Sequence, residues 1–405
     1  MTRAITPALV GLLAGLALAA PAQAQDQTTT LISRAADGGT PNGPSINAVI
    51  SGDRRYARVI AYESEASDLV RGDTNGVKDV FAVKRRGSIN NKGTPWSGGD
   101  SILVSRGLGG DPANGASSGA SVSGDFRHAG SCVAFLSAAS NLVRGDTNGT
   151  VDAFLVTAPG RSPRRVSEPG GRQMTEDANS VTVSGDCDQV SFTTASGRLY
   201  TADVGRDADR VSTRGDASDP SYAAGNSSAL VYAASGGVWL SSNGKSRGSL
   251  VARGGRNPVF NDLKRRSLAY EKSVGGSTQI GYRDVGRGEK IISSRGGERG
   301  NADSRQPVIG NSGFYVTFES DASNLSVSAS GVTGDRNGRP DSYLFSDVRE
   351  ITLVQSVQNR GEPLRGGGEN PSTSYYANYM VFDSPAPLDA PDGTHQVWMR
   401  WLGAV

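Results

Sequence analysis

The stretch SEASDLVRGDTNG, residues 64–76, decides how this chain folds, because nearly the same letters return as SAASNLVRGDTNG at residues 137–149. A third copy is split by an insertion, with SDASNL at residues 320–325 and GDRNG at residues 334–338. A recurring block of this size is one supersecondary unit copied along the chain. The repeat therefore predicts an architecture and says little about a ligand.

Each unit contains short runs of alternating and β-branched residues, which is the pattern of β-strands. In the first unit these runs fall at residues 47–53, 58–63, 79–84 and 101–106. Ser-Gly-Asp, Asn-Gly and Gly-Gly turns separate the runs, and helix-length apolar patterns are missing. The chain is therefore predicted to be all-β and to consist of four-stranded units.

Seven such units can be traced, with six as the alternative if a weak unit is misassigned. The seventh unit ends after Trp401 without room for a fourth strand, whereas residues 28–34 form a strand with no unit before them. We therefore predict a closed β-propeller in which the N-terminal strand completes the last blade and hides the sheet edges. The alternative, an open solenoid, would need capping repeats.

The order of a strand, a Ser-Gly-Asp turn, a Val-Ala-Phe strand and an Asp-Val-Phe strand resembles the WD-like repeat of TolB-type β-propellers. The resemblance is strongest to exported bacterial forms that carry SNLVxGDTNG followed by DVF, and it spans nearly the whole mature chain. It is specific in the first, second and sixth units and weak in the fourth and fifth. The resemblance implies a propeller, although TolB-type propellers usually have six blades and TolB itself has a further N-terminal domain.

The first 24 residues have the pattern of a secretion signal. Arg3 precedes an apolar run at residues 8–20, and Ala22-Gln23-Ala24 matches a signal cleavage site. The run is shorter than the ~18 apolar residues that a membrane-spanning helix needs. We expect a signal peptide at residues 1–24, one propeller domain at residues 25–405, no membrane span, and a location in the periplasm or outside the cell.

The charge of the chain is nearly balanced, with 42 Lys and Arg against 40 Asp and Glu and a formal net charge of +2. Such a balance gives no basis for long-range attraction to nucleic acid or to anionic lipid. We therefore expect no nucleic-acid partner. We expect a monomer that binds a protein or a glycan on one face of the ring.

The repeated Asp-x-Asn-Gly-x-x-Asp loops are the most chemically suggestive feature. Alternate oxygen side chains beside a Gly suit a hard cation such as Ca²⁺. The alternative is a plain turn, since Asn-Gly accepts positive φ and Asp caps backbone N–H groups. Both interpretations stay open for the nine residues Asp73, Asn75, Asp79, Asp146, Asn148, Asp152, Asp335, Asn337 and Asp341.

The two cysteines, Cys132 and Cys187, fall at similar points of neighbouring units. Export would place them where disulfides persist. A bridge between adjacent blades is one interpretation, and two buried free thiols are the other.

Catalytic residues are hard to assemble from the sequence. The chain has two histidines, His128 and His395, which excludes a multi-histidine metal site and leaves few options for a Ser-His-Asp triad. Both are expected in turns or at the surface, and no catalytic residue is assigned. The first expectation is a non-catalytic, exported propeller that acts as a binding or scaffold protein. The alternatives are a glycan lyase or hydrolase that uses carboxylates at the channel mouth, and a purely structural envelope protein.

Overall fold

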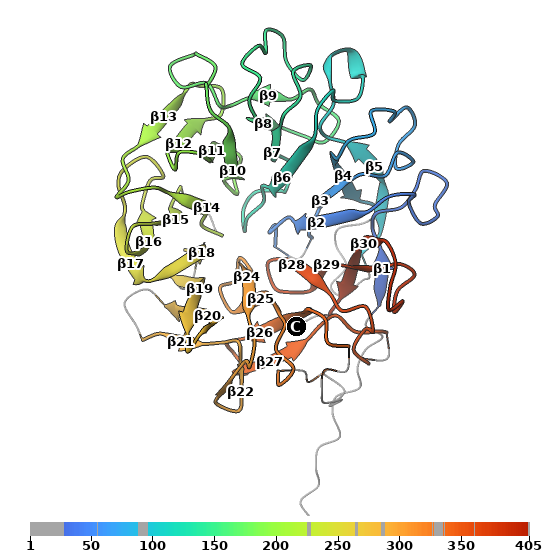
Figure 1. Ribbon diagram of the computed structural model, residues 1–405, viewed down its shortest axis with the longest axis vertical. Helices are drawn as coiled ribbons and strands as arrows, with labels where there is room; N and C mark the ends of the chain where they lie inside the picture. The colour runs from blue at the N-terminus through green and yellow to red at the C-terminus, as the bar shows by residue number, and fades with distance from the viewer. Residues whose placement is uncertain are drawn as a thin grey trace, which may run out of the picture.

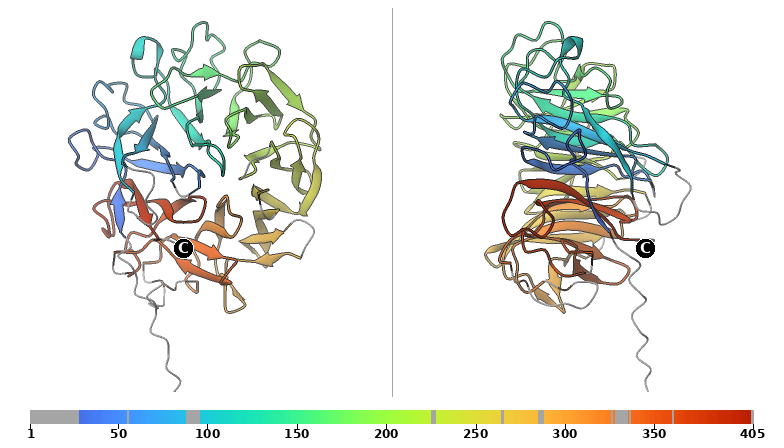
Figure 2. Two further views of the ribbon diagram at one scale, coloured as in Figure 1. Left: turned by 180° about the vertical axis from the view of Figure 1, so that it is seen from behind. Right: turned by 90° about the vertical axis from the view of Figure 1, so that its right-hand side faces the viewer.

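The computed structural model describes residues 28–54, 56–87, 96–224, 228–263, 266–284, 288–325, 327, 335, 337–359 and 361–403. The described chain forms a ring of β-sheets around a central axis (Figure 1). Seen from the side, the ring is a flattened disc (Figure 2). The expected signal peptide lies outside the described residues.

Seven four-stranded antiparallel sheets make up the described ring, which confirms the seven-bladed propeller over the six-bladed alternative. The first two blades are β2(Ser45–Ile50), β3(Val59–Ser64), β4(Asp79–Arg85) and β5(Gly98–Leu103), followed by β6(Ser117–Val122), β7(Val133–Ser137), β8(Asp152–Val156) and β9(Arg164–Arg165). The third and fourth blades are β10(Ala178–Val183), β11(Gln189–Thr194), β12(Leu199–Asp203) and β13(Ala208–Val211), followed by β14(Ser218–Tyr222), β15(Leu230–Ala234), β16(Gly237–Ser241) and β17(Ser249–Arg253). The fifth and sixth blades are β18(Gly255–Asn261), β19(Ser267–Val274), β20(Ser277–Asp284) and β21(Lys290–Ile291), followed by β24(Ser304–Ile309), β25(Tyr315–Ser320), β26(Asp341–Ser346) and β27(Ile351–Val354).

The seventh blade joins the two ends of the chain. It contains β28(Glu369–Thr373), β29(Tyr379–Pro385), β30(His395–Trp401) and, as its outermost strand, β1(Thr29–Leu31). β1 pairs antiparallel with β30, with Leu31 opposite Trp398 and Thr29 opposite Arg400. The predicted closure by the N-terminal strand is therefore confirmed, and the outermost strand that it supplies, β1, is only three residues long.

The core lies between the blades. At the closure, Ile60 and Phe81 of the first blade pack in one buried cluster with Val381 and Met399 of the seventh. Phenylalanines recur at matching strand positions, and burial of each contributes about 1.5–3 kcal/mol. The buried phenylalanines of this series are Phe81, Phe135, Phe154, Phe192, Phe318, Phe345 and Phe382.

The innermost strand of every blade carries an irregularity that sequence patterns did not predict. The register between the first and second strands shifts in all seven blades, for example between Ile46 and Val49 and between Arg305 and Val308. An extra residue in one strand is a β-bulge, which bends the strand and re-aims its backbone. The bulge therefore divides the inner strand into an end that meets the neighbouring blade and an end that leads to the turn before the second strand, which is Ser-Gly-Asp in the first three blades.

Two short elements complete the described chain, a 3-10 turn at Leu108–Gly110 and a hairpin of β22(Ser294–Arg295) and β23(Glu298–Arg299). Within the described residues, no helix has the length and apolar character to cross a membrane.

Candidate active site

The described side chains on the wall of the central channel are poorly suited to catalysis. The innermost strands enclose about 230 Å³. Among the described residues that line this space, the side chains are small, apolar, hydroxyl-bearing or the amide of Asn311, and none is an acid, a base or an imidazole. General acid–base chemistry needs such groups, so the channel wall is a poor place for catalysis.

One end of the channel, called the closed end below, is crossed by hydrogen bonds from one side-chain amide to two backbone carbonyl groups. The Asn311 side chain, which follows β24, donates from Nδ2 to the carbonyl oxygens of Gly52 (2.6 Å) and Gly124 (3.1 Å) on the opposite side of the ring. A Cβ atom added at Gly52 would lie 2.2 Å from Asn311 Nδ2, so any larger residue there would displace this amide. The Ser-Gly-Asp turns therefore meet tightly at this end.

The other end of the channel carries four buried carboxylates, one on the second strand of each of four blades. Each accepts a hydrogen bond from a backbone N–H of the next blade: Glu63 from Gly119 (2.8 Å), Glu271 from Gln306 (2.9 Å), Glu319 from Asn370 (2.9 Å) and Asp383 from Asn47 (2.7 Å). All four donors lie in bulges and have positive φ, between 49° and 65°. These carboxylates therefore join adjacent blades, and at Asn47, Gln306 and Asn370 they hold a backbone conformation that residues other than glycine rarely adopt.

The buried setting changes the acidity of these groups. Burial, with the negative charge of Glu369 adding to it, raises the pKa of Glu319 above its usual value and that of Asp383 well above. Asp383 is 0% exposed, and its Oδ1 atom has no hydrogen-bond partner among the described residues. Carboxylates enclosed in this way are poorly placed to reach a substrate, and so the sequence-based idea of catalytic carboxylates at the channel mouth does not fit this end.

A second cavity, of about 260 Å³, lies between the first two blades beside the closed end of the channel. The turns that follow β2 and β6, two neighbouring innermost strands in Figure 1, form its walls. These turns supply three arginines, one histidine, one tyrosine and two aspartates to a single cavity. Its charged and imidazole side chains are those of Asp53, Arg54, Arg58, Asp125, Arg127 and His128.

His128 and Asp125 form a hydrogen-bonded dyad in this cavity. Both carboxylate oxygens of Asp125 lie 3.1 Å from His128 Nδ1, and Oδ1 also accepts the backbone N–H groups of Arg127 and His128 at 2.7 Å. The Asp125 side chain is 1% exposed, whereas that of His128 is 45% exposed. An ionised carboxylate only accepts hydrogen bonds, so Nδ1 carries the proton and Nε2 of the neutral ring keeps its lone pair. This arrangement suits a general base.

Guanidinium groups surround the dyad. Arg58 is ion-paired with the buried Asp53 and lies over the Tyr56 ring at 4.7 Å. Arg54 lies over the Phe126 ring at 4.2 Å and donates to the Phe126 carbonyl oxygen at 2.6 Å.

The exposed Arg127 side chain forms no hydrogen bond or ion pair with the described part of the chain. With Asp53 already neutralised by Arg58, the cavity presents unbalanced positive charge, and Arg recognises carboxylate and phosphate groups.

His128 lies in a turn, as predicted from the sequence, but its partner Asp125 was not predicted. The sequence signal that could have revealed this dyad is short: an Asp stands three residues before a His, within the tight turn that follows a strand. His395 lies at the start of β30 opposite Pro385, in the seventh blade, and takes no part in this cavity.

The three Asp-x-Asn-Gly-x-x-Asp loops join the second and third strands of the first, second and sixth blades. In each loop the Asn amide donates to the second Asp: Asn75 to Asp79 (2.5 Å), Asn148 to Asp152 (3.0 Å) and Asn337 to Asp341 (3.5 Å). The geometry of a turn is thus present in all three. Among the described residues, no group of three or more His, Cys, Asp or Glu side chains is arranged to hold a metal ion.

Cys132 and Cys187 are joined in a disulfide with Cα atoms 6.0 Å apart. Cys132 directly precedes β7, and Cys187 lies in the turn between β10 and β11. The bridge therefore links the second blade to the third, close to the turn that carries the dyad.

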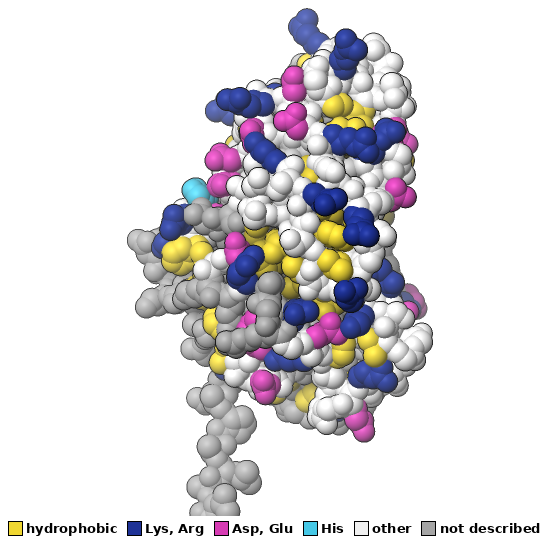
Figure 3. All heavy atoms as spheres, turned by 90° about the vertical axis from the view of Figure 1, so that its left-hand side faces the viewer, with side chains coloured by type: hydrophobic (Ala, Val, Ile, Leu, Met, Phe, Trp, Pro, Cys, Tyr) yellow, Lys and Arg dark blue, Asp and Glu magenta, His cyan; other side chains and the backbone are white. Residues whose placement is uncertain are grey.

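On the outer side of the ring shown in Figure 3, Lys and Arg side chains alternate with Asp and Glu. Large hydrophobic side chains that are exposed in the described chain are limited to Leu108, Val348 and Ile351. The outer side therefore offers no broad apolar surface in this part of the chain, in contrast to the charged cavity between the first two blades.

Comparison with known proteins shows similarity in structure alone. No model of a known family matches the chain, and no curated protein matches its sequence. Among solved structures, an oligogalacturonate lyase in complex with manganese is 11% identical with a TM-score of 0.51, over 93% of this chain and 96% of that chain. An oligogalacturonate lyase from Vibrio parahaemolyticus is 10% identical with a TM-score of 0.50, over 93% and 97%.

At this identity the similarity establishes the fold, a β-propeller, and membership of the TolB type is not shown. The expectation of a non-catalytic binding or scaffold protein was wrong as the first choice, because both similar structures are enzymes.

Proposed function

We propose that this protein is a propeller lyase that cleaves an acidic oligosaccharide in the cavity between its first two blades. The observation that carries the proposal is the Asp125–His128 dyad, whose histidine lines a cavity together with three arginines. The enzymes of similar fold act on oligogalacturonate, a chain of sugar carboxylates. The positive charge of the cavity complements a substrate of that class.

In the proposed reaction, Arg127 and its neighbours bind the carboxylate of a uronic acid residue. His128 Nε2 takes the proton from the carbon next to that carboxylate, C5, and the guanidinium groups stabilise the negative charge that develops. The electron pair of the C5–H bond forms a C4=C5 double bond as the C4–O bond breaks. The leaving oxygen takes a proton from water at the open side of the cavity.

A hydrolase is the less favoured alternative. Glycoside hydrolysis commonly needs two carboxyl groups that flank the bond to be cleaved. The cavity has Asp53 and Asp125, but they are 2% and 1% exposed and are engaged with Arg58 and His128. The elimination needs a base and cationic groups, which the cavity supplies.

Manganese in one similar structure does not transfer to this cavity. Mn²⁺ prefers carboxylate, carbonyl and water oxygens, and the Asp53 and Asp125 carboxylates are committed to Arg58 and His128. No step is therefore assigned to that metal. Structural calcium, which the sequence left open beside a plain turn, stays a proposal that concerns the loops and not the reaction. Export to the periplasm or beyond, and a monomeric state, also stay predictions, and both suit an enzyme that meets polymeric substrates outside the cytoplasm.

The test is an assay of the mature protein on oligomers of galacturonic acid and of other uronic acids, with neutral galactose oligomers as the matched control. Elimination gives an unsaturated uronate, which absorbs ultraviolet light. We expect absorbance to rise with a uronate oligomer and not with the neutral one. His128→Ala should abolish the rise, whereas His395→Ala should retain it. No unsaturated product from any uronate, or equal rates for His128→Ala and wild type, would refute the proposal.

A further inference from the structure

The three repeated loops differ at one position on the strand that follows them. In the second blade, Arg165 of β9 lies opposite Phe154 of β8. In the first and sixth blades the same register position holds Leu103, opposite Phe81, and Val354, opposite Tyr343. One copy of the loop is therefore paired with a cation from its own chain, and two copies are paired with an aliphatic side chain.

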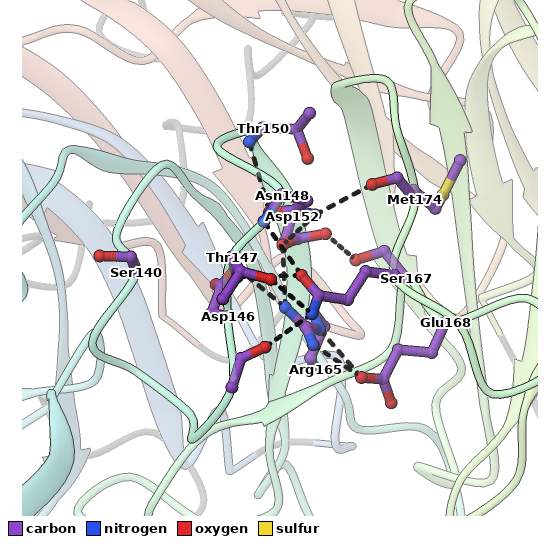
Figure 4. A network of polar contacts seen from close by, with 12 residues as sticks. Ser140, Asp146, Thr147, Asn148, Thr150, Asp152, Arg165, Ser167, Glu168 and Met174 are labelled. Carbon is purple, nitrogen blue, oxygen red and sulfur yellow. Dashed lines mark hydrogen bonds and ion pairs between the residues drawn. The ribbon is translucent and has the colours of Figure 1, made fainter.

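Figure 4 shows what the arginine does in the second blade. Arg165 Nη1 lies 3.0 Å from Asp146 Oδ1 and 3.4 Å from Asp152 Oδ2, so a single positive group lies between the first and last carboxylates of the loop. Its other nitrogens reach Glu168 Oε1, with Nη2 at 2.9 Å and Nε at 3.0 Å. The Arg165 side chain is only 5% exposed, which makes it a built-in counter-ion.

The loops of the first and sixth blades keep the carboxylates without the counter-ion. No Lys or Arg in the described chain forms an ion pair with Asp73, Asp79, Asp335 or Asp341. Asp73 is 7% exposed and Asp341 1% exposed, yet Asp73 Oδ1 and Asp341 Oδ2 have no hydrogen-bond partner among the described residues. In the second blade, the matching carboxylates of Asp146 and Asp152 have no buried oxygen that lacks a hydrogen-bond partner.

The buried carboxylates of these two loops lack the cation that Arg165 supplies in the second blade. Two close carboxylates in a partly dry site repel each other unless a cation lies between them.

We propose that the loops of the first and sixth blades each bind one Ca²⁺ ion, at the place that the Arg165 guanidinium occupies in the second. The ligands in the first blade are Asp73 and Asp79, and those in the sixth are Asp335 and Asp341, with water completing the coordination. Hard cations take such oxygen ligands. The Asn residues are not ligands, because Asn75 and Asn337 donate their amides to the second Asp and accept a backbone N–H through Oδ1.

The proposal places calcium in two of the three loops and therefore predicts two ions per chain. With two carboxylates at each site, binding should be as weak as in extracellular calcium modules, with Kd on the order of 10⁻⁴–10⁻³ M. The role is structural, since each ion would tie the loop to the adjacent strand, as Arg165 does.

The test is a calcium chloride titration of the mature protein after treatment with a chelator, with calorimetry and melting temperature as readouts. We expect two ions per chain and a melting temperature that rises with calcium. Asp73→Asn and Asp341→Asn should each reduce the stoichiometry to one. Asp146→Asn, the matched change in the loop that holds Arg165, should leave it at two.

Leu103→Arg keeps the proposal testable if an Asp variant does not fold. It places an arginine in the first blade at the register position that Arg165 has in the second. This variant should bind one ion and lose part of the response of its melting temperature to calcium. The proposal is overturned if the wild type binds no calcium and melts alike with and without chelator. It is also overturned if Asp146→Asn loses an ion, or if Leu103→Arg still binds two.

Discussion

The two ends of the propeller ring both collect charged residues but treat them in opposite ways. At the bulge end, carboxylates such as Asp383 and Glu319 are enclosed between blades and hold backbone N–H groups in positive-φ conformations. At the Ser-Gly-Asp end, His128 and Arg127 are exposed, although Asp125 beneath them is buried. The enclosed carboxylates stabilise the fold, whereas the exposed charged side chains, which buried groups hold in position, are available for binding and catalysis.

The largest effect should come from Asp125→Asn at the open end. Asn can place its amide against His128 Nδ1 and so favour the tautomer whose Nε2 carries the proton, which removes the base. We expect kcat to fall by about 10²- to 10⁴-fold, the range that general acid–base catalysis contributes. Asp125 is a positioning residue, so the pH profile of the remaining activity should change as well. An unchanged kcat and pH profile would place catalysis elsewhere.

At the enclosed end, Asp383→Ala should affect folding and not chemistry. It leaves the backbone N–H of Asn47 and the side-chain amide of Asn370 without their acceptor in a buried place. We expect a loss of about 2–4 kcal/mol in the free energy of unfolding, measured by denaturant titration. The matched variant Asp383→Asn keeps an acceptor oxygen and should lose less. Lost activity per folded molecule in either variant would erase the contrast between the two ends.

Arg127→Ala should give a smaller and selective effect. The side chain is exposed and makes no hydrogen bond or ion pair within the described chain, so its removal should not lower the melting temperature. A charge-assisted hydrogen bond to a carboxylate is worth about 1.5–3 kcal/mol, so KM for an acidic oligomer should rise about 10-fold or more. Arg127→Lys should recover part of the affinity. A rise in KM that is equal for acidic and neutral sugars would contradict the assignment.

The smallest expected effect is the pH dependence of stability. Burial raises the pKa of Glu319 above its ordinary value of 4.5 and that of Asp383 well above 3.8. A raised carboxyl pKa means that the folded state binds protons more tightly than the unfolded state, so this contribution to stability is full below about pH 4 and is lost as the pH rises past the raised values. In unfolding titrations from pH 4 upward, Glu319→Gln and Asp383→Asn should weaken this decline. An unaltered decline would show that other groups cause it.

The sequence could predict the ring because its signals are local and repeated. Ser-Gly-Asp turns mark the first three blades, and the 64–76 block marks the first, second and sixth. The strand at residues 28–34, which has no unit before it, predicted that the N-terminus completes the last blade, and β1 does pair with β30. The first strands of the last four blades were not identified from the sequence, because no Ser-Gly-Asp turn follows them. These strands are β14, β18, β24 and β28.

The candidate site was harder to predict, because its parts have meaning only in three dimensions. Asp125 and His128 are close in sequence, but their role depends on guanidinium groups such as Arg54 from the preceding blade. Likewise, the loop of the second blade looks like its two relatives until the β8–β9 register brings Arg165 between its carboxylates. Backbone bulges with positive φ at Asn47 and Asn370 depend on carboxylates of the neighbouring blade, which no local pattern reveals.

The most direct test of the contrast between the two ends is to locate bound substrate. Isotope-labelled His128→Ala protein, which should bind without turnover, can be titrated with a galacturonic acid oligomer while backbone amide NMR signals are followed. The account predicts that the shifted signals belong to the turns at residues 53–58 and 125–129. Shifts centred on Glu63, Glu319 and Asp383, or no shifts with any uronate oligomer, would contradict it.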